Sequence, residues 1–384
     1  MRTTLELAFW LSAAVIVYAY VAYPALIALV AGLRPAPPVQ KKEITPPVSL
    51  LIVVRNEEAC LQDKLDNALA LDYPRERLDV LVVSDGSTDG TEAIAARFAD
   101  RGVRLLALPT ARGKAAALNE ALPRAGGEIV VLTDARQALA PDAVRRLTAY
   151  FADPTVGAVS GELHLLASSG SPGRGVGLYW SYEKLIRKAE SRFDSTVGVT
   201  GAIYALRKDL FVPLDPSTIL DDVAIPMRVV LAGRRVMFAP EARAWDRIAE
   251  SAAQEYRRKV RTLAGNYQLV ALHPALLNPL RDRLFWQLVS HKLARLAVPW
   301  CLLVLFLASA GLSLAGSALY RTALAAQAFF YLLAITGGLR ARRRRPLRLT
   351  SLPYAFALLN LAAAGGLIGF LRGSETARWR AASP

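Results

Sequence analysis

The chain has few of the side chains that bind soft metals or form disulfide frameworks. It contains 2 cysteines and 3 histidines in 384 residues. Cys60 and Cys301 lie in different regions, and His164, His273 and His291 are scattered. This pattern excludes a disulfide-rich scaffold and a zinc cluster. A metal site in this chain would therefore have to use carboxylates.

Charged residues are scarce in long stretches at both ends. Leu5–Leu33 has one early acid and then no charge, and it is longer than the about 20 apolar residues that cross a bilayer. A cleaved signal peptide is the alternative, but its apolar region is only about 7–15 residues long. Three further runs, Leu293–Gly316, Leu319–Leu339 and Leu352–Leu371, are almost free of acids. We therefore predict an N-terminal transmembrane helix within residues 1–33 and about three within residues 293–371.

The distribution of arginine predicts the orientation of these helices. The segment RARRRRPLR, at Arg340–Arg348, lies between the last two apolar runs. Loops rich in Lys and Arg stay in the cytoplasm. This places the middle of the chain in the cytoplasm and predicts a multi-pass protein of the cell inner (plasma) membrane. The arginines of the tail, residues 372–384, indicate that the last run re-enters the membrane rather than crossing it.

The net charge of +15 has two interpretations. Nucleic-acid binding predicts basic residues clustered with exposed aromatics on the soluble domain. The densest basic cluster instead lies between two apolar runs, so no nucleic-acid partner is expected. Attraction to membrane lipids and to phosphate-bearing substrates is the better explanation.

The middle of the chain has the pattern of an α/β domain. A proline-rich linker, residues 34–47, precedes short apolar strands that alternate with amphipathic helices over residues 48–270. Such alternation predicts a parallel sheet covered on both faces. Ligands of these sheets bind at the carboxyl ends of the strands.

Polar residues follow several of these predicted strands. Asn56 and Glu57 follow the first, Asp85 and Asp89 the second, and Asp134 a later one. Each of them alone is best explained as a helix cap or turn residue, and we expect Asp89 to be a cap. Capping does not explain why acids recur at one edge of the sheet. We therefore expect a binding site there.

Glycine motifs for known nucleotide folds do not account for this edge. The segment GRGVGL, Gly173–Leu178, follows a loop rather than a strand, and ARGKAAA lacks the upstream glycine of a phosphate-binding loop. Further along, Asp221 and Asp222 precede an apolar run. Acids at a helix start can merely complement the helix dipole, and this stretch alone leaves that alternative open.

Seven segments in order resemble the membrane-bound family-2 glycosyltransferases, including bacterial exopolysaccharide and poly-N-acetylglucosamine synthases. They are VVRNEE, VVSDGSTDGT, RGKAAALNEAL, VVLTDAR, VTGAIYALRKDLF, LDDVAIPMR and RRKVRTLAGNYQ, and they run from Val53 to Gln268. The resemblance implies a Rossmann-like GT-A nucleotide-sugar-binding domain over residues 48–270, inserted between transmembrane helices. It also implies inverting transfer from a nucleotide-diphosphate sugar.

The resemblance also assigns roles to single residues. Asp222 is the implied catalytic base, supported by Asp221, and Asp134 faces a divalent metal, Mg²⁺ or Mn²⁺. Hard oxygen ligands suit either ion, which would help the diphosphate to leave. The implied substrate-binding residues are the nucleobase ligand, its neighbours, a phosphate-side lysine and two small residues at the acceptor: Asp85, Asn56, Glu57, Lys114, Gly201 and Ala202.

Two positions depart from the family pattern. The family usually has Asp-x-Asp where this chain has Asp134-Ala135-Arg136, which weakens the expected metal site, and Arg136 is an alternative contact for phosphate. Processive members have Gln-x-x-Arg-Trp where this chain has Arg258, Arg261 and Thr262. Arg258 and Arg261 remain candidate substrate-binding residues, and Arg261 can pair with diphosphate. The aromatic platform is missing, so we do not expect long-chain synthesis.

Two amphipathic segments have alternative interpretations. Residues 271–292 are predicted as an interfacial helix, because Leu284, Phe285, Leu288 and Val289 share one side of it. Packing of that side against the domain is the alternative. Gly177–Arg192 is predicted as a structural helix, and its Tyr and Trp residues are also suited to lining an acceptor groove.

The sequence thus predicts a cytoplasm-facing membrane glycosyltransferase that uses a nucleotide-diphosphate sugar, most simply a UDP-sugar. Its expected acceptor is a lipid-linked or polysaccharide precursor, and accessory biosynthetic subunits are further candidate partners. One alternative is a polyprenyl-phosphate sugar synthase. Another is a catalytically silent membrane subunit that binds nucleotide or glycan. All three require Asp85, Asp134 and Asp222 to converge.

Overall fold

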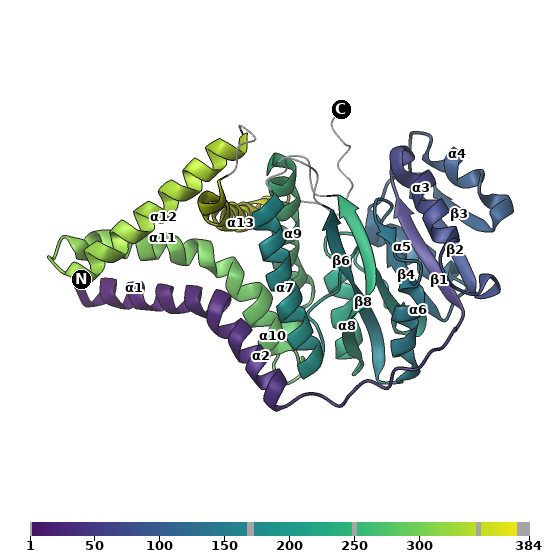
Figure 1. Cartoon of the computed structure of the whole chain (residues 1–384), viewed down its shortest axis with the longest axis horizontal. Coiled ribbons are helices and arrows are strands. Elements are labelled where there is room, and N and C mark those ends of the chain that lie inside the picture. Colours follow the sequence, from purple (N-terminus) through teal and green to yellow (C-terminus); the bar gives the residue numbers. More distant parts are fainter. Residues whose placement is uncertain (1, 167–172, 248–251, 343–346, 375–384) are drawn as a thin grey trace.

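The computed structural model describes residues 2–166, 173–247, 252–342 and 347–374 (Figure 1). Two sequence predictions fall partly outside these ranges. Residues 343–346 of the arginine-rich loop and residues 375–384 of the tail are not among the described residues.

The middle of the chain folds around one eight-stranded sheet, whose strand order is β3-β2-β1-β4-β7-β6-β8-β5. Strands β3, β2, β1 and β4 are mutually parallel, β7 is antiparallel to both β4 and β6, and β5 is antiparallel to β8. The bounds of the strands are β1 Val48–Val54, β2 Leu78–Asp85, β3 Val103–Leu108, β4 Ile129–Thr133, β5 Ala138–Leu139, β6 Val156–Leu166, β7 Tyr204–Arg207 and β8 Arg235–Arg247. The predicted parallel sheet is therefore wrong beyond β4, because the regular alternation of strands and helices ends there.

The register of the parallel strands brings their carboxyl ends to one edge. Val54 of β1 pairs with Ser84 of β2, and Ile52 of β1 pairs with Thr133 of β4. The residues that follow these strands are therefore neighbours, although they are far apart in the sequence.

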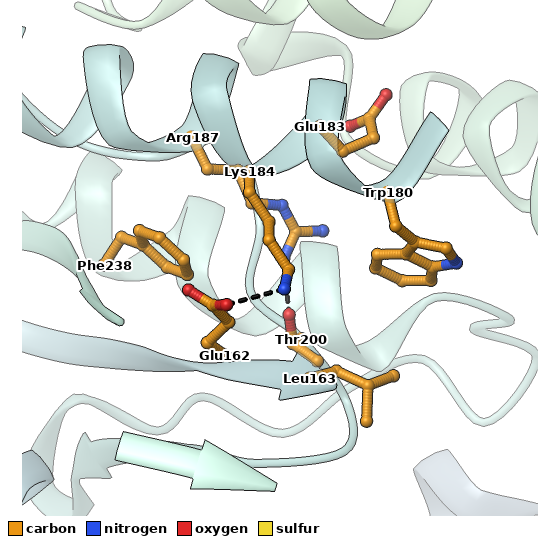
Figure 2. A pocket seen from close by; sticks show the side chains of 8 residues that line it. All are labelled: Glu162, Leu163, Trp180, Glu183, Lys184, Arg187, Thr200 and Phe238. Atoms are coloured by element: carbon orange, nitrogen blue, oxygen red, sulfur yellow. Dashed lines mark hydrogen bonds and ion pairs between the residues drawn. The ribbon is translucent and has the colours of Figure 1, made fainter. Parts of the chain in front are cut away.

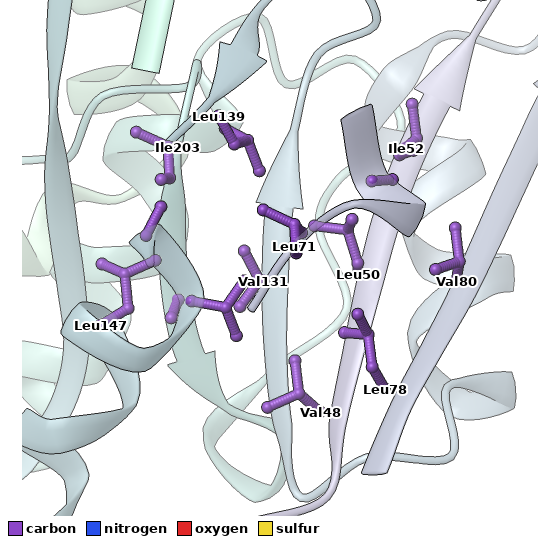
Figure 3. Packing of buried hydrophobic residues seen from close by; sticks show 14 of the residues in the cluster. Val48, Leu50, Ile52, Leu71, Leu78, Val80, Val131, Leu139, Leu147 and Ile203 are labelled. Carbon is purple, nitrogen blue, oxygen red and sulfur yellow. The ribbon is translucent and has the colours of Figure 1, made fainter. Parts of the chain in front are cut away.

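Helices cover both faces of the sheet and build two apolar cores. Alternate residues of β1 point to opposite faces, with Leu50 and Ile52 in one core and Leu51 and Val53 in the other. Figure 3 shows the first core, which α3, α4 and α6 cover, whereas α5 and α8 cover the second. The bounds of these helices are α3 Glu58–Leu69, α4 Thr91–Ala96, α5 Lys114–Ala121, α6 Ala143–Thr148 and α8 Asp221–Leu231.

Four helical segments are long and apolar enough to cross a membrane: Arg2–Leu33, Phe285–Ser313, Ala318–Ala341 and Leu349–Leu371. They contain α1 Arg2–Val17, η1 Tyr18–Ala22, α2 Tyr23–Leu33, α10 Phe285–Gln287, η8 Leu288–Leu293, α11 Ala294–Ser313, α12 Ala318–Arg342 and α13 Arg348–Leu371. Figure 1 shows α1, α11 and α12 extending together away from the sheet, whereas α13 is seen nearly end-on. Helix α13 therefore runs across the direction of the other three.

Two long helices, α7 Gly173–Phe193 and α9 Ala252–Leu272, stand between the sheet and the apolar helices (Figure 1). Helix α9 packs closely on α13, because added Cβ atoms at Gly365 and Gly366 would lie 3.0 Å from the Tyr256 hydroxyl and 2.9 Å from the Ala264 nitrogen. The absence of side chains on these glycines lets the two helices approach to backbone contact.

A buried ionic cluster joins α7 to the apolar helices. The His291 ring is 0% exposed, and its Nδ1 and Nε2 lie 2.8 Å from Glu190 and 2.9 Å from Glu183. Tyr23 donates a hydrogen bond of 2.7 Å to Glu190, and Arg295 donates one to Glu183. Burial by itself raises the pKa of the Glu183 carboxyl, but the charges of Arg295 and His291 outweigh burial and hold that pKa well below its ordinary value.

The helix expected over residues 271–292 is not continuous. A 3₁₀ turn, Pro274–Leu277, comes first, and the helix that begins at Phe285 continues into the apolar segment. Leu284 and Leu288 are both 0% exposed and belong to the second core of the domain. These two leucines therefore pack against the domain, as in the alternative to an interfacial helix, because the core offers them apolar partners.

Candidate active site

The loop after β1 is held to the loop after β2. Asn56 has a φ of 54°, which is uncommon for a residue other than glycine. Its Oδ1 accepts a hydrogen bond of 2.8 Å from the Thr88 backbone, and its own N–H donates to the Ser87 hydroxyl at 3.2 Å. The Glu57 N–H donates to the Thr91 hydroxyl at 2.9 Å. Asn56 and Glu57 thus lie at the expected edge, where they shape its loops.

Asp89 also belongs to this pair of loops. Its Oδ1 accepts a hydrogen bond of 3.0 Å from the N–H of Thr91, the first residue of α4. Gly90, not Asp89, occupies the N-cap position of α4, so Asp89 bonds the first helical N–H from one residue before the cap.

Asp85 connects the end of β2 to the start of α5. Its side chain is 0% exposed, and its two oxygens accept hydrogen bonds of 2.8 Å from the backbone N–H groups of Arg112 and Gly113. Gly86 follows with a φ of 63°, and a Cβ there would lie 2.5 Å from the Ala111 nitrogen. Asp85 therefore fixes the turn that precedes Lys114. Its contact with a nucleobase stays a prediction.

Lys114 brings two of the predicted acids together. Its Nζ lies 2.8 Å from Asp134, which follows β4, and 3.4 Å from Asp221, the first residue of α8. Burial favours the neutral amine, but the charges of Asp134 and Asp221 outweigh it and raise the pKa of Lys114. Segments about a hundred residues apart thus meet at one half-buried cation.

Asp222 lies beside this cluster. Burial and the charge of Asp221 raise the pKa of the Asp222 carboxyl to about 6, although Lys114, Arg187 and Lys292 lower it. Within the described part of the chain, Asp222 forms no ion pair of its own. A carboxylate with this pKa is ionised at neutral pH and remains basic enough to accept a proton.

The predicted small residues border the same carboxylate. A Cβ added to Gly201 would lie 3.5 Å from the Asp222 Oδ2. The carbonyl of Ala202 accepts a hydrogen bond of 2.8 Å from the Thr133 hydroxyl at the end of β4. Gly201 therefore leaves space directly in front of Asp222, and Ala202 holds this loop to the sheet.

Two further residues of this cluster were given no role by the sequence analysis, although Tyr204 lies within one of the seven segments. Tyr204 is 0% exposed, and burial together with Asp221, Asp222 and Asp134 raises the pKa of its hydroxyl well above the ordinary value. Lys64 is 2% exposed and donates to the Thr133 hydroxyl at 2.9 Å and to the Gln137 carbonyl at 2.7 Å.

Lys64 and Lys114 differ in their charge partners. The hydrogen-bond acceptors of Lys64 are neutral, so burial dominates and lowers the pKa of Lys64 to about 7. The charge of Asp134 only partly opposes this effect. A lysine on an amphipathic helix looks exposed in the sequence, so only the tertiary structure identifies this one as buried.

The structure does not bring Arg258 and Arg261 into contact with the acids. Both lie on α9, where Arg258 is exposed and Arg261 is half-buried, and no described ion pair joins either of them to Asp134, Asp221 or Asp222. Helix α9 nevertheless packs beside this cluster, because a Cβ at Gly265 would lie 2.5 Å from the Leu220 side chain. Their contact with substrate stays a prediction.

The side chains at this edge could bind a divalent cation only together with oxygen atoms of the substrate. Within the described ranges, no group of three or more His, Cys, Asp or Glu side chains could hold a metal ion. Arg136, in place of a second acid, lies 3.7 Å from Asp246. Asp134 is a hard oxygen ligand with a side chain 35% exposed, and Mg²⁺ is commonly bound through one or two carboxylates together with substrate phosphates.

Known proteins resemble this chain over the same region. The family described as "Glycosyltransferase like family 2" matches residues 46–265. A poly-beta-1,6-N-acetyl-D-glucosamine synthase of Staphylococcus epidermidis is 26% identical over 251 residues, which are 64% of this chain and 58% of that protein. The enzyme of the same name from Staphylococcus aureus strain COL is 26% identical over 229 residues, or 58% of this chain and 55% of that protein. The chain thus matches less than two thirds of the length of these relatives.

A solved structure resembles nearly the whole chain. It is a mannosyltransferase from Pyrobaculum calidifontis in complex with GDP-Man and Mn²⁺, and its sequence is 25% identical to this chain. The match covers 96% of this chain and 100% of that one, with a TM-score of 0.72. The likeness therefore includes the apolar helices as well as the sheet.

Proposed function

The chain belongs to glycosyltransferase family 2 and has the GT-A fold, and from this premise we propose that it transfers a sugar from a nucleotide-diphosphate sugar to an acceptor at the membrane, with inversion. The observation that carries the proposal is the convergence of Asp134, Asp221 and Lys114 beside Asp222. The proposal is also supported by the GDP-Man bound to the similar mannosyltransferase.

In this proposal Asp222 removes the proton of the acceptor hydroxyl. The acceptor oxygen then forms a bond to the anomeric carbon, while the bond from that carbon to the phosphate oxygen breaks. The electron pair of the broken bond leaves with the nucleoside diphosphate. Lys114 lies where it can neutralise the diphosphate, and Asp85, Asn56 and Glu57 hold the loops that surround the nucleotide.

A divalent cation would be held by Asp134 together with the diphosphate, and it would stabilise the charge of the leaving group. The Mn²⁺ in the similar mannosyltransferase supports this assignment. Lys114 already supplies one positive charge at Asp134, so we expect the dependence on metal to be graded rather than absolute.

For the membrane, we propose three crossings with the catalytic domain on the cytoplasmic side of the plasma membrane. The segments α1–α2, α10–α11 and α12 extend in one direction, whereas α13 runs across them and packs on α9 (Figure 1). An interfacial α13 keeps the arginine-rich loop and the tail on the side of the domain, in line with the positive-inside rule. The acceptor would then reach Asp222 from the membrane, as expected for a precursor of cell-surface polysaccharide or glycolipid.

Release of nucleoside diphosphate tests the transferase proposal. The full chain in nanodiscs is given a panel of UDP- and GDP-sugars with Mg²⁺ or Mn²⁺, together with a membrane extract as acceptor. Because a general base contributes about 10²–10⁴-fold to a rate, Asp222→Asn is expected to lose about that factor while still binding the donor.

Asp215→Asn is the matched control, because Asp215 lies in an exposed turn where its carboxylate bonds Ser217. Equal and negligible release by wild type and Asp222→Asn with every donor would overturn the proposal. That result would favour the alternative of a catalytically silent subunit.

A further inference from the structure

Lys64 of α3 binds both ends of the turn that carries Asp134. This turn connects β4 to β5, and its residues 134–136 lie between Thr133 and Gln137. The Lys64 ammonium donates hydrogen bonds of 2.9 Å to the Thr133 hydroxyl and 2.7 Å to the Gln137 carbonyl. One buried cation thus closes the turn on both sides of the acid that is proposed to meet the metal and the diphosphate.

The Thr133 hydroxyl also bonds the loop in front of Asp222. It accepts the hydrogen bond from Lys64 and donates one of 2.8 Å to the Ala202 carbonyl. Ala202 follows Gly201, where an added Cβ would lie 3.5 Å from the Asp222 Oδ2. Two successive hydrogen bonds therefore connect Lys64 to the loop that borders the proposed base.

The start of the same loop is held by α7 and β6. Figure 2 shows the Thr200 hydroxyl facing α7, from which Arg187 donates a hydrogen bond to it. The Thr200 N–H donates to the Ser160 hydroxyl of β6 at 3.0 Å. The loop is therefore fixed on both sides of Gly201, and Thr133 with Lys64 supplies the contacts on the Ala202 side.

The surroundings of Lys64 show that it acts through these residues and not on a ligand. Its side chain is 2% exposed, so it does not reach the substrate. Leu61 and Ala68, one helical turn before and after it on α3, belong to the first apolar core. Both hydrogen-bond acceptors of Lys64 are neutral, and a buried charge without an opposite charge is costly compared with an apolar side chain. Stability alone therefore does not explain a lysine at this position.

Asn67, one helical turn further along α3, makes contacts of a different kind. Its Oδ1 accepts a hydrogen bond of 2.8 Å from the Leu139 N–H, and its Nδ2 donates one of 3.0 Å to the Leu139 carbonyl. Leu139 belongs to β5, the strand at one edge of the sheet. Asn67 thus holds α3 to an edge strand beyond the turn, whereas Lys64 holds the turn itself.

We propose that Lys64 is a positioning residue for the active site. It fixes the Asp134 carboxylate for the donor diphosphate and, through the Thr133 hydroxyl, the loop of residues 201–202 in front of Asp222. The inference rests on the proposed function and adds to it a residue that touches neither substrate nor metal. Groups that orient a metal ligand in this way contribute about 10–100-fold to metal affinity or activity.

Mn²⁺ binding and kinetics of the full chain in nanodiscs test this role together. Electron paramagnetic resonance measures the dissociation constant of Mn²⁺ in the presence of UDP or GDP, and nucleotide release measures kcat. Lys64→Met has a side chain of similar length that bonds neither end of the turn. It is expected to weaken Mn²⁺ binding and to lower kcat, each by about tenfold or more.

A pair of variants at Thr133 gives the answer even if Lys64→Met does not fold. Thr133→Val has nearly the same shape, but it neither accepts a hydrogen bond from Lys64 nor donates one to Ala202. It is expected to show the same two losses. Thr133→Ser keeps the hydroxyl and is expected to stay within about twofold of wild type in both measurements, because the network is retained.

Asn67→Ala is the matched control, because it removes two hydrogen bonds between the same helix and the sheet without touching the turn. It is expected to lower the Tm but to leave Mn²⁺ affinity and kcat within about twofold of wild type. The positioning role is overturned if Lys64→Met changes neither quantity or if Asn67→Ala changes both as much as Lys64→Met. Equal losses in Thr133→Ser and Thr133→Val would overturn it too.

The two measurements separate this proposal from the transferase proposal. If wild type releases no nucleotide from any donor but its Mn²⁺ binding depends on Lys64, the transferase proposal fails and the positioning of Asp134 stands. If wild type releases nucleotide and Lys64→Met behaves like Asn67→Ala, only the positioning role fails. If wild type neither releases nucleotide nor binds Mn²⁺ with UDP or GDP, both proposals are overturned.

Discussion

Two regions of the molecule are assembled by different kinds of contact. One is the donor edge, the edge of the sheet at Asp85, Lys114 and Asp134 where the donor sugar is proposed to bind. The other is the buried ionic cluster at α7. At the donor edge, Asp85 bonds backbone N–H groups 27 and 28 residues away, and these donors carry no net charge. In the ionic cluster, His291 bonds glutamates 101 and 108 residues away, and all of these groups are buried. The donor edge is thus built from contacts between neighbouring loops of one domain, whereas the ionic cluster joins the catalytic domain to the apolar helices.

This difference has an energetic consequence. A buried backbone N–H that loses its acceptor costs about 1–3 kcal/mol, whereas removing one partner of a buried ion pair costs about 3–5 kcal/mol. The ionic cluster should therefore be the more fragile region, although it contains no proposed catalytic residue.

The largest effect is expected from His291→Leu. It removes the ring that bonds both Glu183 and Glu190. Removing one partner of a buried ion pair costs about 3–5 kcal/mol. Arg101→Ala is the control, because its pair with Asp66 at 2.8 Å is exposed and such pairs contribute about 0–1 kcal/mol. Thermal unfolding in one detergent compares them. Similar losses in both variants would show that the buried cluster does not hold the domain in place.

A smaller effect is expected at the donor edge from Gly86→Ala. Gly86 and Gly233 both have positive φ, of 63° and 80°, but only a Cβ at Gly86 meets backbone, 2.5 Å from the Ala111 nitrogen. Gly233→Ala therefore costs only the strain of a left-handed residue, about 1–2 kcal/mol. Gly86→Ala is expected to cost more and to raise the KM for the donor sugar at least fivefold.

Urea unfolding and donor kinetics on both glycine variants check this. If Gly233→Ala raised the donor KM as much as Gly86→Ala, the turn before Lys114 would have no special role in donor binding.

The same comparison explains what could be predicted from the sequence. Strand ends are visible as apolar runs that stop at Asp85 or Asp134, and parallel pairing brings such ends to one edge. The placement of Asp85 and Asp134 at one edge was predictable for this reason, whereas Lys114 was expected there from the family resemblance alone. The turn that Asp85 fixes was not, because its partners are backbone groups that any residue would provide.

Other features depend on contacts that a sequence pattern does not encode. The amphipathic pattern around Leu284 and Leu288 fits a membrane interface or a protein core equally well. Only the tertiary structure shows that both residues belong to the core of the domain. Lys64 has the pattern of a surface lysine, yet it is buried below the Asp134 turn. Arg187 bonds the Thr200 hydroxyl and its charge lowers the pKa of Asp222, and both partners reach it from other elements.

The central claim is that Lys114, the two neighbouring acids and Asp222 act as one electrostatic unit with Asp222 as its base. The most direct test is the pH dependence of kcat/KM for sugar transfer by wild type, Lys114→Gln and the control Lys188→Gln, which removes the same charge from an exposed position on α7. Because the base must be ionised and its pKa is raised to about 6, activity is expected to rise with pH through about 6.

Lys114 lowers the pKa of Asp222, so Lys114→Gln should move this rise to higher pH, whereas Lys188→Gln should leave it unchanged. A rise near the ordinary carboxyl value of about 4, or one that Lys114→Gln does not move, would contradict the account.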